Sequence, residues 1–309
     1  MNFLKPKFWG IKKSIFVFLL IPFSILFNLL LFIKKKVFVV KKFKIPIICV
    51  GNIYIGGTGK TPLAIKINNE LKNLKKKSII IKKYYKRHED EHKLIQEKTG
   101  SLILNKNRSK AIMEAEKKDY DVVILDDGFQ DHSIQKNLNI ICFNSNQLDG
   151  NGWVLPAGPL RENLNSIQDA QIMIINGEKN DEFEQKVLRI SKNIKIYYSK
   201  YSPTNIEQFI NKKIYAFAGI GNPENFFKLL SKYNLNIQKK ITYPDHYNYN
   251  QKELGQIIDE AIKNKCEIIT TEKDFFRIKD HGLNQIKFLK IKLEILEEKK
   301  FINEILNYL

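Results

Sequence analysis

The sequence predicts an α/β fold built on a mostly parallel sheet flanked by helices, with a second, smaller α/β domain and an N-terminal membrane-associated helix. From residue 45 onward, short apolar runs alternate with amphipathic segments, which is typical of βαβ units. A second series of the same kind follows Ser202 and Pro203, which favours a domain boundary near residue 200. A long uncharged segment before residue 34 predicts the separate helix.

The 309 residues are enough for two ordinary domains. We expect residues 1–43 to form a membrane anchor helix with its basic flank, residues 44–200 the core domain, and residues 201–309 a C-terminal α/β domain. The strands expected in the core domain are residues 45–50, 78–81, 122–125, 140–143, 172–175 and 194–197, and its clearest helices are residues 62–74 and 109–118. The C-terminal domain is expected to contain strands at residues 214–218, 237–242, 267–271 and 286–291, helices at residues 223–233 and 251–264, and a final helix.

Residues 14–33 form an uncharged stretch that, as a helix, is ~30 Å long and matches the hydrocarbon core of a bilayer. The first 44 residues hold ten lysines and no acid, and lysines beside an apolar helix are attracted to anionic headgroups, so we expect a membrane surface as a partner. These lysines argue against a buried core helix, and the absence of a small-residue cleavage site argues against a signal peptide. Pro22 near the middle, with Ser24 and Asn28 on one face, leaves open whether the helix spans the bilayer or lies in its interface.

The composition is that of a globular protein, with 43% hydrophobic and 28% charged residues. The net charge of +19 attracts phosphates, anionic lipid or nucleic acid, although lysines on ordinary solvent faces explain part of it equally well. The sequence has no helix-turn-helix, RNP-like or zinc pattern, so we expect no nucleic-acid partner. The three cysteines lie far apart, which excludes a disulfide framework and indicates a reducing, cytosolic compartment.

A glycine-rich turn between an apolar strand and an amphipathic helix predicts a nucleotide site of the P-loop type. Its glycines let backbone N–H groups surround phosphate oxygens, Lys60 supplies a charge for the β- and γ-phosphates, and the Thr61 hydroxyl can bind Mg²⁺. The residues expected to bind the nucleotide here are Tyr54, Ile55, Gly56, Gly57, Thr58, Gly59, Lys60 and Thr61. Tyr54 stands where the usual motif has its first glycine, and a glycine-rich loop with an incidental lysine is the alternative.

Two adjacent acids, Asp126 and Asp127, follow the apolar run at residues 122–125. A P-loop enzyme needs an acid at the end of a neighbouring strand to hold its metal ion. Because adjacent carboxylates repel each other unless a cation lies nearby, we expect Asp126, Asp127 and Thr61 to bind Mg²⁺. Solvated turn acids are the alternative.

Six segments together resemble one family, the tetraacyldisaccharide 4′-kinases of lipid A biosynthesis. The matching segments are VGNIYIGGTGKTPL (50–63), ILDDGFQ (124–130), GNGWVLPAGPLRE (150–162), AGIGNPENFF (218–227), YPDHYNY (243–249) and TTEKDFFR (270–277), in family order over nearly the whole chain. The resemblance implies transfer of the ATP γ-phosphate to the 4′-hydroxyl of an acylated glucosamine disaccharide 1-phosphate. It also implies a location at the cytoplasmic face of the inner membrane and an active site in a cleft between two α/β domains, which the C-terminal domain of residues 201–309 closes.

The resemblance carries further residues into the nucleotide site. Gln130 matches the glutamine of DDGFQ, and Arg161 and Glu162 match the family's L-R-E, in which a guanidinium pairs with phosphate and a carboxylate fixes it. A salt bridge that supports the loop before them is the alternative role for these two residues. Lys273, in the T-T-E-K-D segment, is also expected near the nucleotide. His132 is given no role, because Asp131 interrupts the family pattern there.

The acceptor hydroxyl needs a group that receives or orients its proton, and the resemblance implies an Asp–His pair for this step. His246 matches the histidine of P-D-H, and Asp90 is the best match for the aspartate, although Glu89 and His92 replace its usual glycine and proline neighbours. With Lys60, these two are the expected catalytic residues, and the sequence leaves open which of the pair is the base. A charged surface turn for Asp90 and a helix-capping role for His246 are the alternatives.

A second class of function is a membrane-tethered P-loop ATPase or GTPase without a small-molecule acceptor. Such a protein has no use for Asp90, His246 or the LPAGPLRE segment, so their presence favours the kinase. A guanine nucleotide is not indicated, because Lys273 and Asp274 are adjacent and not separated by one residue.

Overall fold

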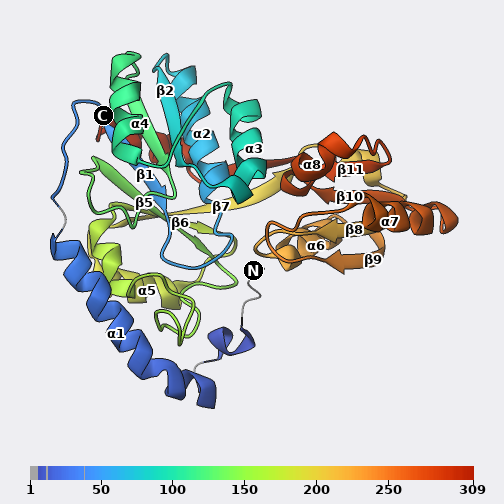
Figure 1. The fold of residues 1–309 in the computed structure, drawn as a ribbon, viewed down its shortest axis with the longest axis horizontal. Coiled ribbons are helices and arrows are strands. Elements are labelled where there is room, and N and C mark those ends of the chain that lie inside the picture. Colours follow the sequence, from blue (N-terminus) through green and yellow to red (C-terminus); the bar gives the residue numbers. More distant parts are fainter. Residues whose placement is uncertain (1–5, 12, 38) are drawn as a thin grey trace. The chain divides into compact units, whose positions relative to one another are not determined.

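The computed structural model describes residues 6–11, 13–37 and 39–309 (Figure 1). Its contacts divide the described chain into two compact units. The large unit comprises residues 6–84, 99–200 and 294–309, and the small unit comprises residues 85–98 and 201–293. These limits differ from the expected domains in two segments: residues 85–98 belong with the second α/β series, and residues 294–309 return to the first.

The large unit contains a sheet of eight strands in the order β12-β7-β6-β5-β1-β4-β2-β3. The strands are β1 (Ile47–Gly51), β2 (Ser78–Lys83), β3 (Leu102–Asn105), β4 (Val122–Asp126), β5 (Leu138–Asn144), β6 (Ile172–Asn176), β7 (Lys195–Pro203) and β12 (Ile291–Ile295). The described registers are all parallel, and β1 lies between β4 and β5 at the centre. Every residue of β1 and β4 is buried, as expected for parallel strands covered on both faces.

Four α-helices pack with this sheet: α2 (Lys60–Asn73), α4 (Arg108–Lys117), α5 (Asp181–Ile190) and α9 (Glu298–Leu306). A 3₁₀ segment, η3, covers Leu164–Asp169. The amphipathic pattern of α2 explains its place, because Leu63, Ile67 and Leu71 all lie on its buried side. α9 belongs here because Phe301 is buried and its ring meets that of Tyr197 from β7 edge to face.

The small unit contains a parallel four-stranded sheet in the order β11-β10-β8-β9. Its strands are β8 (Lys213–Ala218), β9 (Asn236–Thr242), β10 (Glu267–Thr271) and β11 (Ile286–Leu289), and its helices are α3 (Glu89–Thr99), α6 (Pro223–Lys232), α7 (Gln251–Lys263) and α8 (Glu272–Ile278). Separate apolar clusters hold alternate residues of β8, which places one core on each face of this sheet. α7 begins at a capping box in which Asn250 and Glu253 each accept a backbone N–H of the other.

The apolar helix α1 (Ile15–Val37) follows the short 3₁₀ segment η1 (Lys7–Gly10). It is long and apolar enough to cross a bilayer, with a mean hydropathy of 2.7, and only 11% of its most apolar stretch is buried. Val17 and Ser24 are its buried residues, whereas large side chains such as Phe18, Leu19 and Phe23 are exposed. The helix is therefore not a core helix: it contacts the large unit along a narrow stripe and leaves the rest of its apolar surface uncovered.

The sequence patterns located most sheet strands of both units to within a few residues, but β3 was not expected, and β7 ends at Pro203 and not near residue 197. The expected strand at residues 286–291 is interrupted at Lys290, whose backbone N–H donates to Asn205 Oδ1, and β12 continues beyond it. Helices α3, α5 and α8 were also not expected. α3 is rich in charge and has few apolar positions, of which Leu94 and Ile95 are buried, so its pattern gave a weak signal.

Candidate active site

The glycine-rich loop joins β1 to α2, so that the helix begins at Lys60. Gly59 precedes it with a φ of 91°, a left-handed conformation that a residue with a Cβ adopts at a cost. At the other end of the loop, a Cβ on Gly51 would lie 2.3 Å from the Cβ of Phe129. Glycine at Gly51 is therefore what lets the loop of residues 127–130 approach the end of β1.

Asn52 organises the nucleotide loop, a role that the sequence analysis did not assign. Its buried side-chain amide donates to the carbonyl of Tyr54 over 2.6 Å and to Thr58 Oγ1 over 2.9 Å. The backbone carbonyl of Asn52 accepts a 2.7 Å hydrogen bond from Gln130 Nε2. The signal available in the sequence was a polar Asn52 directly after an apolar run and before the glycine-rich turn. The predicted residue Gln130 thus lies beside the loop and supports its backbone.

The two acids after β4 have different surroundings. Asp126 is fully buried; its Oδ2 accepts a 2.9 Å hydrogen bond from Thr61 Oγ1 and contacts the Lys82 ammonium at 2.5 Å. Asp127 is partly exposed and pairs with Lys60 at 3.6 Å and with Arg161 at 3.0 Å. Desolvation raises the pKa of Asp127, but the positive charges of Lys60 and Arg161 outweigh it and hold that pKa well below its usual range.

A divalent cation fits the acids at this position. The Oδ1 atom of Asp126 is buried and has no hydrogen-bond partner among the described residues, while the Thr61 hydroxyl donates to the other carboxylate oxygen, Oδ2. A hydroxyl and a carboxylate oxygen are the donors that Mg²⁺ uses in P-loop sites. The described residues contain no group of three or more His, Cys, Asp or Glu side chains suited to a metal ion. These two residues therefore fit a cation that takes its other ligands from nucleotide phosphates and water.

The predicted pair Arg161 and Glu162 lies next to the nucleotide loop, but the two side chains have separate partners. The Arg161 guanidinium contacts Asp127, and its backbone N–H donates to the carbonyl of Ile53 over 2.6 Å. Glu162 lies 3.3 Å from the imidazole of His132, a residue to which the sequence gave no role. Arg161 is thus held at the acids by its own backbone and by Asp127, whereas Glu162 faces a neighbouring histidine.

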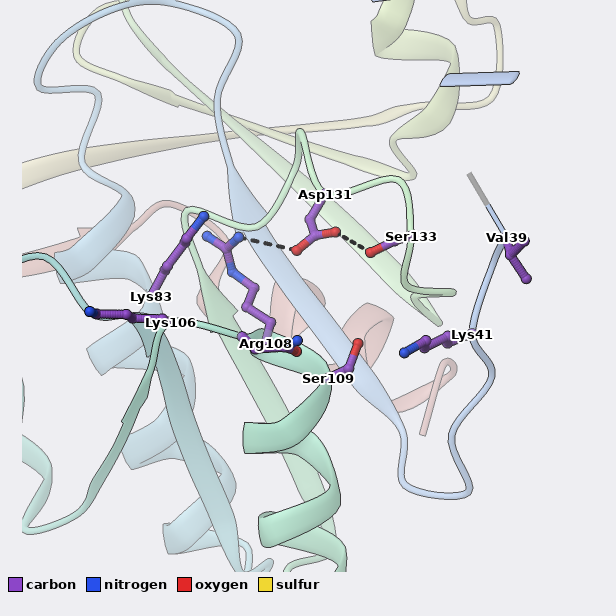
Figure 2. A pocket seen from close by; sticks show the side chains of 9 residues that line it. Val39, Lys41, Lys83, Lys106, Arg108, Ser109, Asp131 and Ser133 are labelled. Atoms are coloured by element: carbon purple, nitrogen blue, oxygen red, sulfur yellow. Dashed lines mark hydrogen bonds and ion pairs between the residues drawn. The ribbon is translucent and has the colours of Figure 1, made fainter. Parts of the chain in front are cut away.

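A basic cavity of about 430 Å³ lies in the large unit, and Figure 2 shows the side chains that line it. Its lining includes the cations Lys41, Lys83, Lys106 and Arg108 and one carboxylate, Asp131. Arg108, the first residue of α4, spans the distance to the acids: its guanidinium donates to the carbonyl of Asp127 over 2.6 Å and to Asp131 over 3.2 Å. The excess of positive charge at the N-terminus of a helix suits an anionic group. Arg108 was not among the predicted site residues, because one arginine in a lysine-rich chain is no signal.

The small unit brings together the predicted acid and histidine. Asp90 Oδ1 lies 3.3 Å from His246 Nδ1, and both residues belong to the same compact unit, although the sequence analysis placed them in different domains. Asp90 lies in the first turn of α3 with a side chain only 2% exposed, so the surface-turn alternative is wrong. His246, which follows β9 with a φ of 56°, stacks on the ring of His88 at 4.4 Å. The pair is an ordered site within one unit.

Arg277, on α8, contacts this pair and was not among the predicted site residues. Its Nη2 and Nε atoms donate to Asp90 Oδ2 over 2.6 and 3.1 Å. The segment TTEKDFFR contains it, but the pattern gave no reason to separate it from the other charges. The predicted residue Lys273, also on α8, pairs with Glu91. Its expected place near the nucleotide stays a prediction.

The site combines a glycine-rich strand-to-helix loop on a parallel sheet, a buried acid bonded to the loop threonine, and a lysine and an arginine on the second acid. This combination defines a P-loop nucleotide-binding enzyme. The chain belongs to the tetraacyldisaccharide-1-phosphate 4′-kinase family, whose profile matches residues 16–309. Among its relatives are the tetraacyldisaccharide 4′-kinases of Pelagibacter ubique, 43% identical over 99% of this chain and 98% of that protein, and of Rickettsia canadensis, 33% identical over 96% and 94%. The fold is similar to a crystal structure of LpxK from Aquifex aeolicus in complex with ATP, with a TM-score of 0.73 and 23% identity over 94% of this chain and 99% of that one.

These comparisons confirm the family, the α/β fold and the enzyme class that the sequence predicts. An enzyme of this family transfers a phosphoryl group from ATP to the 4′-hydroxyl of a tetraacyldisaccharide 1-phosphate. Membership of this family therefore excludes, as the main function, a P-loop ATPase or GTPase that has no small-molecule acceptor.

Proposed function

We propose that the chain carries out this reaction with the nucleotide loop of the large unit and the Asp90–His246 pair of the small unit. In the reaction, the 4′-oxygen of the acceptor forms a bond to the γ-phosphorus of ATP, the bond from that phosphorus to ADP breaks, and the hydroxyl proton passes to the Asp90–His246 pair. The observation that carries the assignment is the 2.9 Å hydrogen bond between Thr61 and Asp126, which lies beside the Lys60–Asp127 pair. Together these residues supply the contacts for the phosphates and for the cation.

The nucleotide loop supports the ATP side of the proposal. Lys60 at the start of α2 provides the charge for the γ-phosphate, and Arg161 adds a second cation on the same side as Asp127. Thr61 and Asp126 would hold Mg²⁺, which when bound neutralises the charge that develops on the phosphate oxygens. The LpxK structure from Aquifex aeolicus contains ATP, which supports the same nucleotide here.

The basic cavity supports recognition of the acceptor's second anionic group. The substrate carries a 1-phosphate, and Lys41, Lys106 and Arg108 surround a space that suits a phosphate. Lys41 follows helix α1 closely in the sequence, so this space lies near the part of the chain that we assign to the membrane. We assign the 1-phosphate of the lipid to this cavity.

Helix α1 supports membrane association, and we assign the enzyme to the cytoplasmic face of the inner membrane. Its exposed apolar side chains require cover by lipid, and Lys34 to Lys36 follow them at the helix C-terminus. ATP and a reducing compartment for the buried thiols of Cys49 and Cys142 are both found on the cytoplasmic side.

The direct test incubates full-length protein in detergent micelles with γ-labelled ATP, Mg²⁺ and the acylated disaccharide 1-phosphate. Label in a lipid that is phosphorylated at the 4′-position is the expected result. Release of labelled inorganic phosphate at an unchanged rate without lipid, and no labelled lipid, would instead support a nucleotide hydrolase.

A further inference from the structure

Lys82 is a buried cation near the end of an apolar strand. Residues 79–81 of β2 are buried, and the side chain of Lys82, which follows them, is only 6% exposed. β2 and β4 are parallel neighbours, and their register places Lys82 opposite Asp126. Because an ammonium group loses its hydration when it is buried, a lysine is seldom enclosed in this way unless a partner compensates its charge. A partner of Lys82 is the acid at which we place Mg²⁺.

Lys82 and Thr61 contact the same oxygen of Asp126. The ammonium donates to Oδ2 over 2.5 Å, and the Thr61 hydroxyl donates to it over 2.9 Å. Oδ1 of the same carboxylate is buried and accepts no hydrogen bond from the residues that the structure describes. Two donors on one oxygen hold the carboxylate in one orientation and leave the lone pairs of the other oxygen available. Lys82 thereby helps to determine which oxygen a metal ion can take.

The contacts of the two acids bring more positive than negative charge to this site. Asp126 contacts Lys82, and Asp127 contacts both Lys60 and Arg161. A divalent ion that comes from water without a nucleotide would lose part of its hydration and meet these cations, which repel it. The phosphates of a nucleotide add several negative charges and reverse this balance. The site is therefore suited to a divalent ion only when phosphates are present.

We propose that Lys82 is a positioning residue that serves as the counter-cation of Asp126 while no nucleotide is bound, so that Mg²⁺ enters this site together with the nucleotide phosphates and not before them. The ammonium neutralises a carboxylate that would otherwise lie buried and unpaired, which is a strongly destabilising arrangement. It also keeps Oδ1 as the oxygen that is available to the ion. The inference rests on the proposed function, because it concerns the ion that this function places at Thr61 and Asp126.

Lys82 and Mg²⁺ compensate the same negative charge, so one can replace the other in part. If an uncharged side chain of similar length replaces Lys82, the buried carboxylate loses its counter-charge and attracts a divalent ion more strongly. An ion that binds only the folded protein stabilises it, and the stabilisation grows with the affinity of the ion. Mg²⁺ alone should then stabilise such a variant, although it should have little effect on wild type.

The test measures Mg²⁺ binding to full-length protein in detergent micelles without nucleotide, by calorimetry and by thermal melting. Lys82→Met should melt at a lower temperature than wild type, and added Mg²⁺ should restore most of the loss. Its affinity for Mg²⁺ should exceed that of wild type by about 10- to 100-fold, the range over which a group that contacts a metal ligand changes metal affinity. Lys82→Arg keeps the charge and should respond to Mg²⁺ as wild type does. When ADP is added, Mg²⁺ should raise the melting temperature of wild type as well.

Two control variants locate the effect at Asp126. Lys66→Met removes another little-exposed lysine of the large unit, which pairs with Glu70 at 2.9 Å and with Glu298 at 2.6 Å. Its melting temperature should fall, but Mg²⁺ should not restore it. The double variant of Lys82→Met with Asp126→Asn lacks both charges and should lose the Mg²⁺ affinity that Lys82→Met gains. Sodium chloride at equal ionic strength should not reproduce the effect of Mg²⁺ on any of these proteins.

Three results would overturn the inference. The first is nucleotide-free wild type that binds Mg²⁺ as tightly as Lys82→Met does. The second is a Lys82→Met protein that Mg²⁺ neither stabilises nor helps to fold, and the third is equal recovery of its melting temperature in sodium chloride. None of these measurements uses the lipid acceptor. A wild-type protein that transfers no label to lipid would therefore refute the proposed function while leaving the result for Lys82 to be decided by its own data.

Discussion

Ser24 and Val154 connect the apolar helix to the nucleotide site. The Ser24 hydroxyl, fully buried on α1, donates to the carbonyl of Val154 over 2.8 Å and accepts the N–H of Ala157 over 2.9 Å. A few residues further on, the backbone of Pro159 accepts a hydrogen bond from the N–H of Ile55 in the nucleotide loop. The segment of residues 150–162 is thus bonded to α1 on one side and to the nucleotide loop on the other.

The first prediction concerns this serine. Ser24→Ala leaves the buried Val154 carbonyl and Ala157 N–H without their partner, which costs about 1–3 kcal/mol for a buried polar group. We expect a lower melting temperature for full-length protein in detergent micelles. Leu26→Ala, at an exposed position on the same helix, is the control and should change the melt little. Equal melts for the two variants would mean that the hydroxyl does not hold the helix.

The second prediction concerns phosphate handling. Lys60→Ala removes the charge that meets the transferring phosphoryl group, and removal of one such stabilising group lowers kcat by roughly 100- to 1000-fold. Because Lys60 is at the start of α2 and not in the core, circular dichroism should show an intact fold. Lys76→Ala, at an exposed loop position, is the matched control. A folded Lys60→Ala protein with wild-type turnover would remove the P-loop assignment.

The third prediction separates the two acids. Asp126→Asn takes the charge from the carboxylate that meets Thr61 and should raise the Mg²⁺ concentration needed for half-maximal activity, and weaken Mg²⁺–ATP binding measured by calorimetry. Asp127→Asn removes the partner of Lys60 and Arg161 and should mainly lower kcat. If magnesium titrations of both variants coincided with that of wild type, the cation would bind elsewhere.

The sequence predicted the parts of this molecule whose signals are local. Most strands of the two sheets are apolar runs in the sequence, and the spacing of the loop that ends in Lys60 and Thr61 is typical of phosphate binding. Contacts between distant segments were out of reach. Arg277 meets Asp90 across 187 positions of sequence, and nothing near either residue signals the other. For the same reason the sequence did not show that α3 belongs to the small unit, because its few apolar residues do not indicate which core they enter.

The last prediction tests whether Asp90 and His246 act as one group. Their contact at 3.3 Å lies inside one compact unit, so the pair needs no domain movement to form. Asp90→Ala and His246→Ala should each lower kcat strongly while the KM for ATP changes little, because the nucleotide loop belongs to the other unit. In the double variant, the loss of kcat should be far smaller than the product of the two single losses, because either single variant already disables the pair. Steady-state kinetics of the four proteins at saturating ATP measures this directly. A fully multiplicative loss of kcat would mean that the two residues have independent roles. An unchanged rate for Asp90→Ala would mean that a neighbouring carboxylate acts in its place, such as Glu91, which pairs with Lys273 on α8.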